Sequence, residues 1–138
     1  NCEVLESMEY TWKDTLSLMG WGVENDGLSV IFDKVIPDFI SKELPDVIKK
    51  FPVKKLDGYI LHSGGMRIIE AYKKIFNKDK TIMESQNILA NYGNVSSVSV
   101  LLVLLEMIKK KYCGNFMMCA LGPGFTAALS KLKLNSHD

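Results

Sequence analysis

The sequence predicts an α/β fold in which helices pack on a mixed β-sheet. Short apolar runs bounded by glycine alternate with longer segments whose apolar residues recur at helical spacing, and two apolar runs near the carboxyl end flank a Gly-Pro-Gly turn. The chain has 138 residues, of which 47% are hydrophobic, so it can bury one core but is too short for two ordinary domains. We therefore expect one domain, a mixed sheet with its covering helices.

The first part of the chain is expected to hold two strands joined by a loop. β-branched and aromatic residues predict a strand over 3–13. Glycines and polar residues around Trp21, within 20–27, predict an irregular loop. A second, shorter strand is predicted over 28–32.

A long helix and a buried strand are expected next. Apolar residues at helical spacing predict a helix over 36–51, and Pro45 is expected to bend or restart it. The apolar run over 58–61 is typical of a central parallel strand that is buried on both faces. His62 would then stand at the carboxyl end of this strand.

Three further helices are predicted in the middle of the chain. The first spans 67–76, with its apolar residues on one face. Residues 81–84, Thr-Ile-Met-Glu, have the pattern of a capping box and predict a helix that ends near residue 90. Ser96 or Ser97 is expected to cap an apolar helix that ends near residue 110.

The carboxyl-terminal part predicts a β-hairpin. Residues 115–121 and 125–132 are apolar runs, and the Gly-Pro-Gly turn at 122–124 lies between them. The domain is expected to extend over 1–134, and the polar tail 135–138 is expected to fray.

Charge and hydropathy exclude several classes of partner. The 17 basic residues nearly balance 16 acidic ones, so the chain has no global basic field that would recruit nucleic acid. Its longest apolar stretch, at 98–105, is shorter than the roughly 20 residues that a membrane span requires. The amino-terminal end has no signal-peptide pattern and suggests a chain cut from something longer.

The cysteines argue against a disulfide framework and against a zinc site. The chain has three of them, Cys2, Cys113 and Cys119, without C-x-x-C spacing and without a nearby histidine. We therefore expect no bound metal and a reducing, cytoplasmic compartment.

Two short loops place hydrogen-bond donors at the ends of predicted elements. Residues 61–65 carry His62 and residues 92–97 carry Asn94, each between an apolar run and a helix-like segment. A neutral imidazole and a carboxamide can both donate to one carbonyl oxygen. This pair therefore indicates stabilisation of an enolate or oxyanion, as in thioester carbon chemistry.

Five motifs, in this order, resemble the carboxy-terminal domain of type III polyketide synthases, the chalcone and stilbene synthase-like enzymes. The resemblance covers nearly the whole chain, and the spacing of 32 positions between His62 and Asn94 belongs to it. The motifs are Met19-Gly20-Trp21 with Asp26-Gly27-Leu28, Val35-Ile36-Pro37, Leu61-His62-Ser63-Gly64-Gly65, Tyr92-Gly93-Asn94-Val95-Ser96-Ser97, and Leu121-Gly122-Pro123-Gly124-Phe125-Thr126.

The resemblance implies one half of a thiolase-like fold. In that family a cysteine nucleophile, a histidine and an asparagine form the catalytic set, and His62 and Asn94 match the latter two by motif. The cysteine lies in the first half, which this chain lacks. The family chemistry condenses an acyl-coenzyme A starter with malonyl-coenzyme A, and uses no metal or redox cofactor. We expect the isolated chain to be inactive and the complete protein to be a homodimer.

The resemblance also implies substrate contacts. Gly64, Gly65 and Arg67, at the start of the helix after His62, would receive a pantetheine oxygen or a phosphate of coenzyme A. Gly122, Pro123, Gly124 and Phe125 would form a wall of the cyclisation cavity. Val30 stands where plant members carry a gatekeeper phenylalanine, and its smaller side chain suggests a long or aliphatic starter.

Two alternatives stay open from the sequence. Met66-Arg67-Ile68-Ile69-Glu70 also resembles the helix after the histidine of third-type ketoacyl-acyl-carrier-protein synthases. A non-catalytic, thiolase-like half that serves dimerisation or binding is the second alternative.

Overall fold

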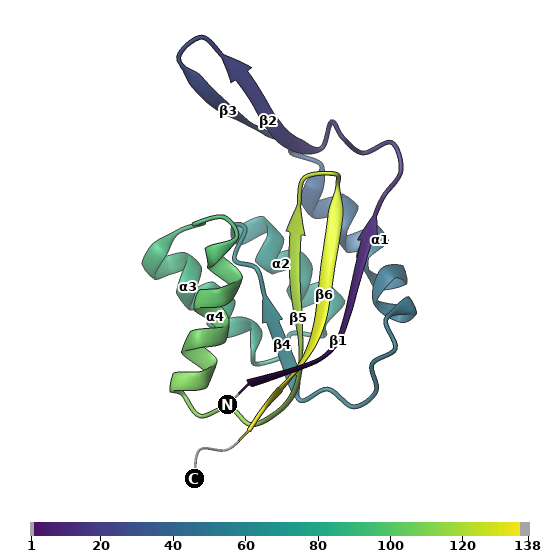
Figure 1. Ribbon diagram of the computed structural model, residues 1–138, viewed down its shortest axis with the longest axis vertical. Coiled ribbons are helices and arrows are strands. Elements are labelled where there is room, and N and C mark those ends of the chain that lie inside the picture. Colours follow the sequence, from purple (N-terminus) through teal and green to yellow (C-terminus); the bar gives the residue numbers. More distant parts are fainter. Residues whose placement is uncertain (1, 136–138) are drawn as a thin grey trace.

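A computed structural model describes residues 2–135 and contains a four-stranded sheet, a separate two-stranded hairpin and four helices (Figure 1). The sheet order is β1-β6-β5-β4. Its strands are β4 (Gly58–Leu61), β5 (Gly114–Gly122), β6 (Thr126–Leu134) and β1 (Cys2–Thr11). β4 pairs in parallel with β5, and the other neighbours are antiparallel, so the mixed sheet of the prediction is confirmed.

The remaining elements surround this sheet. β2 (Met19–Glu24) and β3 (Gly27–Phe32) form the hairpin, which projects beyond the end of the sheet where β5 turns into β6 (Figure 1). The helices are α1 (Ile36–Lys50), α2 (Met66–Ile75), α3 (Ile82–Tyr92) and α4 (Val98–Lys109). Each predicted helix is present, with bounds within a few residues of those expected.

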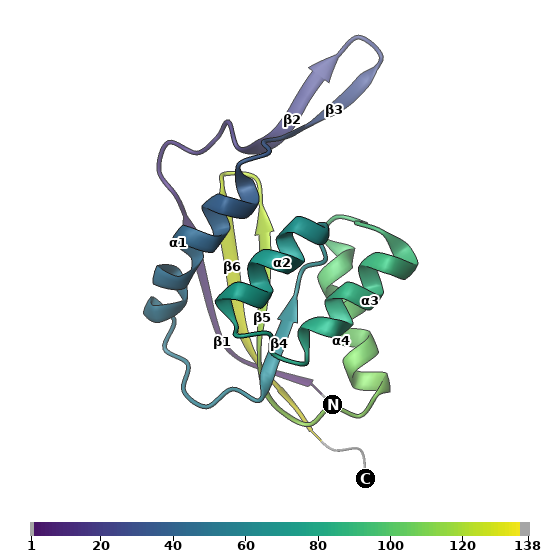
Figure 2. The same cartoon turned by 180° about the vertical axis from the view of Figure 1, so that it is seen from behind.

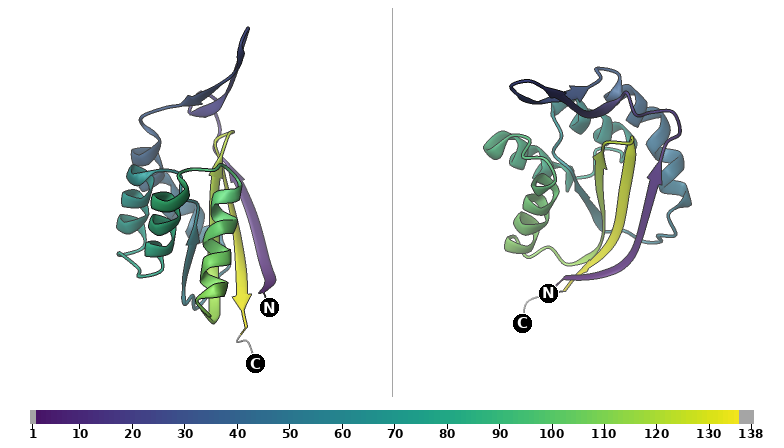
Figure 3. Two further views of the ribbon diagram at one scale, coloured as in Figure 1. Left: turned by 90° about the vertical axis from the view of Figure 1, so that its left-hand side faces the viewer. Right: turned by 45° about the horizontal axis from the view of Figure 1, so that its top comes forward.

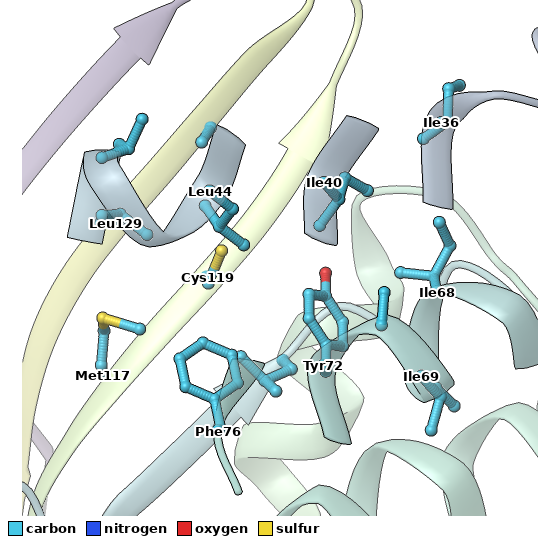
Figure 4. Close-up of a cluster of buried hydrophobic side chains, with 14 of the residues drawn as sticks. Ile36, Ile40, Leu44, Ile68, Ile69, Tyr72, Phe76, Met117, Cys119 and Leu129 are labelled. Carbon is cyan, nitrogen blue, oxygen red and sulfur yellow. The ribbon is translucent and has the colours of Figure 1, made fainter. Parts of the chain in front are cut away.

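The main core lies between one face of the sheet and the helices α1 and α2, which cover that face (Figures 2 and 3). Side chains of β5 and β6 alternate, so Met117, Cys119 and Leu129 point to this face and are fully or almost fully buried. Leu44 of α1 and Tyr72 of α2 meet them from the helix side (Figure 4). This packing fixes the carboxyl end of β4, where His62 stands.

A second, smaller core lies beside the edge strand. Ile60 of β4 and Phe116 of β5 point to the opposite face and pack against Val103 and Met107 of α4. α4 covers only this part of the face. Leu132 and Leu134 of β6 are also buried in this core. Over β1 and the part of β6 near the turn the same face stays open, with Glu9 and Ala128 exposed.

Four local expectations were wrong or need correction. The predicted loop around Trp21 is strand β2, because a two-residue turn at 25–26 lets Met19–Glu24 pair with Gly27–Phe32 in full register. The helix at 36–50 runs through Pro45 as one element and does not restart there. β4 is an edge strand and not a central one; helices rather than a further strand bury it.

The predicted side-chain caps of α3 and α4 were also wrong. Thr81 accepts a hydrogen bond from the backbone N–H of Tyr59 at 2.8 Å, so its hydroxyl ties α3 to β4 and does not cap α3. Glu84, the other half of the expected capping box, is buried and accepts from Lys110 at 2.6 Å and from Tyr112 at 3.1 Å. Ser97 likewise makes no side-chain cap to α4.

The described part of the domain ends just after its last strand. The last strand ends at Leu134, and Asn135 donates to Glu3 at 2.8 Å. The rest of the tail predicted to fray, 136–138, lies outside the described residues, as does residue 1.

Candidate active site

His62 continues the parallel ladder by one residue beyond β4. Its backbone N–H donates to the carbonyl of Cys119 at 3.0 Å, so the sheet itself fixes where this residue leaves the strand. The residue is 8% exposed. Burial lowers the pKa of the imidazole below its ordinary value, which favours the neutral ring at physiological pH. A neutral imidazole keeps one N–H donor and one acceptor nitrogen.

Asn94 follows α3 and reaches across to the loop that carries His62. Gly93 ends the helix with a φ of +72°, a conformation that favours glycine and that turns the chain toward that loop. The Nδ2 of Asn94 donates to the carbonyl of Gly64 at 3.1 Å. The backbone N–H of Gly64 in turn donates to the carbonyl of His62 at 3.0 Å. The two loops, 32 positions apart, therefore meet as one unit.

The structure brings His62 and Asn94 to the same hollow. Both line a small inner pocket, which apolar side chains of α1 and α2 also line. The other lining residues are Met19, Phe32, Ile36, Ile40, Gly64, Ile68, Leu121 and Phe125. Both also line an open groove. Among the other residues of that groove are Glu9, Trp21, Val30, Ser96, Gly122, Pro123 and Thr126. Two N–H donors thus stand where an apolar pocket opens to water.

Five of the predicted substrate residues line the groove or the inner pocket. Val30, Gly122 and Pro123 line the groove, and Gly64 and Phe125 line the inner pocket. Phe125 is 1% exposed, and its ring stacks on Trp12 with 5.8 Å between the ring centres, so its contribution to the pocket is a wall held by the core.

Three predicted contacts lie apart from the hollow. Gly124, with a φ of +140°, shapes the turn between β5 and β6. Gly65 precedes α2 with a φ of +150°, and Arg67 is exposed on the first turn of that helix. These residues line neither the pocket nor the groove.

Met19, Trp21 and Phe32 belong to the site but were missed by the sequence reasoning. In the β2–β3 register, Met19 stands opposite Phe32 and Trp21 opposite Val30, so all four share one face of the hairpin. In the sequence, the alternation of these side chains with Gly20, Gly22 and Ile31 was the pattern that could have indicated two strands with one shared face. Trp21 and Val30 are paired across the two strands, and both line the groove.

None of the three cysteines is placed to act at this site. Cys119 is buried in the core, and burial raises the pKa of its thiol to about 12, so almost no thiolate forms at neutral pH. Cys2 pairs with Leu134, and Cys113 precedes β5; both stand at the end of the sheet opposite to His62. A nucleophilic cysteine would have to come from outside these residues.

Residues 2–135 contain neither a membrane-spanning helix nor a cluster of metal-ligating side chains. No helix in this part of the chain is long and apolar enough to cross a membrane. Within the same residues, no group of three or more His, Cys, Asp and Glu side chains is arranged to hold a metal ion.

The α/β fold described above is that of a known family of synthases. The chain belongs to the family of chalcone and stilbene synthases, and residues 13–129 match the C-terminal domain of that family. The chain is similar to a putative chalcone synthase of Bacillus subtilis, with 28% identity over 137 residues. It is also similar to the 1,3,6,8-tetrahydroxynaphthalene synthase of Streptomyces peucetius, with 29% identity over 136 residues.

Solved structures share the fold. A fungal type III polyketide synthase, ORAS, superposes with a TM-score of 0.85 at 20% identity and covers 97% of this chain. The 1,3,6,8-tetrahydroxynaphthalene synthase of Streptomyces coelicolor gives a TM-score of 0.85 at 23% identity and covers 99%. The predicted family and the thiolase-like α/β fold are therefore confirmed.

The chain matches only a part of each of these proteins. The segment aligned with the Bacillus protein includes 92% of this chain but 38% of that protein. The segment aligned with the Streptomyces peucetius enzyme includes 90% of this chain but 36% of that enzyme. The chain spans 41% and 42% of the two solved structures. These fractions fit the prediction of a C-terminal half.

Proposed function

We propose that this chain is the C-terminal half of a polyketide synthase that condenses an acyl-coenzyme A starter with malonyl-coenzyme A. The observation that carries the proposal is the convergence of His62 and Asn94 on one pocket that opens to water. The names of the curated relatives, a putative chalcone synthase and a 1,3,6,8-tetrahydroxynaphthalene synthase, and of the similar solved type III polyketide synthases support the same reaction class.

In the proposed reaction, the acyl group is carried as a thioester on a cysteine of the other half. Malonyl-coenzyme A loses carbon dioxide, and the electron pair of the broken bond forms an enolate of the acetyl thioester. The enolate carbon attacks the acyl carbonyl, a carbon–carbon bond forms, and the cysteine leaves as a thiolate. The product is a β-ketoacyl thioester of coenzyme A.

His62 and Asn94 would act on the thioester oxygen, where negative charge develops during decarboxylation. Donors held in fixed positions stabilise that charge more than they stabilise the neutral substrate, so they lower the barrier. The low pKa of His62 supports this role, because the neutral ring can donate one N–H without carrying its own charge.

The groove would hold the substrates themselves. Trp21 and Val30 of the hairpin, with Gly122 and Pro123, would border the growing chain, and the apolar inner pocket would take its hydrocarbon part. Gly64, Gly65 and Arg67 would approach the coenzyme A arm from the start of α2. The proposal needs no metal or redox cofactor, and it includes a homodimer in the cytoplasm.

The test compares single substitutions in the chain after it is joined to a half that carries the cysteine. His62→Ala and Asn94→Ala should each lower the rate of malonyl-coenzyme A decarboxylation by a factor of roughly 10²–10³, since each removes one donor. Asn91→Ala is the matched control, because Asn91 is exposed on α3 and lines neither the pocket nor the groove.

Two results would contradict the proposal. Full decarboxylation by the doubly substituted protein would show that these donors do not act on the thioester oxygen. Condensation by the isolated 138-residue chain would show that a nucleophile is present after all. Circular dichroism of each variant separates loss of folding from loss of chemistry.

A further inference from the structure

The side chain of Asn94 is held at both of its polar atoms. Its Nδ2 donates to the carbonyl of Gly64 at 3.1 Å, and its Oδ1 accepts from the backbone N–H of Ser96 at 3.0 Å. A carboxamide nitrogen has two hydrogens, so one remains for the pocket that Asn94 lines. The orientation of this group decides whether the pocket meets a donor or an acceptor.

A second group, the hydroxyl of Ser99, also reaches Oδ1. Ser99 lies in the first turn of α4 and is fully buried. Its Oγ accepts from the backbone N–H of Val95 at 2.9 Å. Because a hydroxyl that accepts a hydrogen bond still has its own hydrogen to donate, that hydrogen can point to Oδ1 of Asn94, 3.4 Å away.

The opposite orientation of the carboxamide is disfavoured by this arrangement. A half-turn of the group would place Oδ1 against the carbonyl of Gly64, with two acceptors facing each other. It would also place Nδ2 against the N–H of Ser96, with two donors facing each other. Ser99 adds to this preference in two ways, because it holds the loop through Val95 and donates to the oxygen that must stay turned away from the pocket.

We infer that Ser99 is a positioning residue that holds the Asn94 carboxamide with its N–H toward the reacting thioester. The inference rests on the proposed function of Asn94 and adds a residue that does not itself touch substrate. Ser99 stands neither in the pocket nor in the groove, so its effect on the reaction must pass through Asn94.

The test is a double-mutant cycle in the joined enzyme, with malonyl-coenzyme A decarboxylation as the readout. Ser99→Ala should lower kcat roughly tenfold, the size expected for one lost hydrogen bond, and should leave KM nearly unchanged. Ser99→Thr, which retains the hydroxyl, should restore most of kcat. In the Asn94→Ala background, Ser99→Ala should have no further effect, because the group that it positions is already absent.

A matched control is Ser41→Ala. Ser41 lies on α1, and its hydroxyl donates to the backbone carbonyl of Pro37 at 2.9 Å. It lines neither the pocket nor the groove. This variant should keep its full kcat. If Ser99→Ala does not fold, Ser99→Cys takes its place, since the thiol is of similar size and a weaker donor, and a smaller loss in kcat is then expected.

The outcomes separate this inference from the function on which it rests. If Asn94→Ala is impaired while Ser99→Ala keeps its full kcat, the positioning role is overturned and the proposed function stands. If Ser99→Ala lowers kcat by the same factor with and without Asn94, its effect is a general structural one and the inference is also overturned. If Asn94→Ala is itself fully active, both proposals fail.

Discussion

The two faces of the four-stranded sheet are covered very differently. On one face, Met117, Cys119 and Leu129 are buried beneath α1 and α2. On the other face, α4 covers only the part near β4, and its own outer side leaves Leu101 and Leu105 53% and 45% exposed. The chain thus closes its core on one side and keeps apolar surface on the other, as expected for one half of a larger fold.

The site lies where these two environments meet. His62 and the inner pocket belong to the closed face, whose packing gives them fixed positions and low exposure. Asn94 and the groove belong to the exposed end of α3 and to the loop before α4. The closed face can therefore set the geometry of the site, while the open side gives the substrate access.

The strongest test of this comparison is a pair of leucine substitutions. Leu44→Ala, on the closed face at 0% exposure, should lower the free energy of unfolding by about 2–5 kcal/mol, because it removes buried surface and leaves a cavity. Leu101→Ala, at 53% exposure on α4, should change it by less than about 0.5 kcal/mol. Urea unfolding at one protein concentration measures both, and equal losses would contradict the comparison.

A second prediction concerns how α4 is attached. Glu84 of α3 is 5% exposed and accepts from Lys110, just after α4, and from Tyr112, so this carboxylate ties both helices to the start of β5. Glu84→Ala should lower the free energy of unfolding by about 1–3 kcal/mol, since it leaves the partner groups without their acceptor. Glu106→Ala is the control, because its contact with Lys110 is longer, at 3.6 Å. A larger loss for Glu106 would contradict this view of the attachment.

The open face predicts self-association of the isolated chain. Val98, Leu101 and Leu105 form an exposed apolar stripe on α4, and association would remove it from water. Light scattering should show species larger than the monomer at high concentration, and the double substitution Leu101→Lys, Leu105→Lys should shift them toward the monomer. Met83→Lys, at an exposed position of α3, is the control. A wild-type chain that stays monomeric would count against an uncovered interface.

The smallest expected effect is a pH dependence that arises on the closed side. Burial lowers the pKa of His62 below its ordinary value of 6.5, so the unfolded chain takes up the proton first as the pH falls. The contribution of His62 to stability is therefore complete above about pH 6.5 and declines as the pH falls from there toward the lowered pKa. The wild type should therefore lose more stability than His62→Gln as the pH falls through this range. Urea midpoints of the wild type and His62→Gln at pH 5.5 and 7.5 measure it, and parallel changes in both would exclude His62 as the cause.

Local patterns predicted most elements and both key loops. The helical spacing of Ile68, Ile69 and Tyr72 predicted α2, and the glycine-bounded run before His62 predicted β4, because each pattern reflects which side chains must be buried. The hairpin of β5 and β6 followed from its Gly-Pro-Gly turn. For the site, the sequence predicted that His62 and Asn94 stand at element ends, and the resemblance predicted that they meet.

Other features depend on partners that are distant in sequence. Gly20 and Gly22 are poor strand formers, so the pairing of β2 with β3, and with it the place of Trp21 on the groove, comes from cross-strand contacts rather than from propensity. The hydroxyl of Thr81 could cap a helix or bind the N–H of Tyr59, and the position of β4 decides for the latter.

The sequence by itself determined the α/β class, the order of its helices and main strands, and the residue types available for chemistry, because burial imposes a period on each element. Only the tertiary structure decided that β4 is an edge strand, that none of the three cysteines lines the pocket or the groove, and that Ser96 and Ser99 hold the Asn94 carboxamide. Hydrogen-bond direction and strand order depend on which distant segments come to lie side by side. A local sequence pattern does not specify which segments these are.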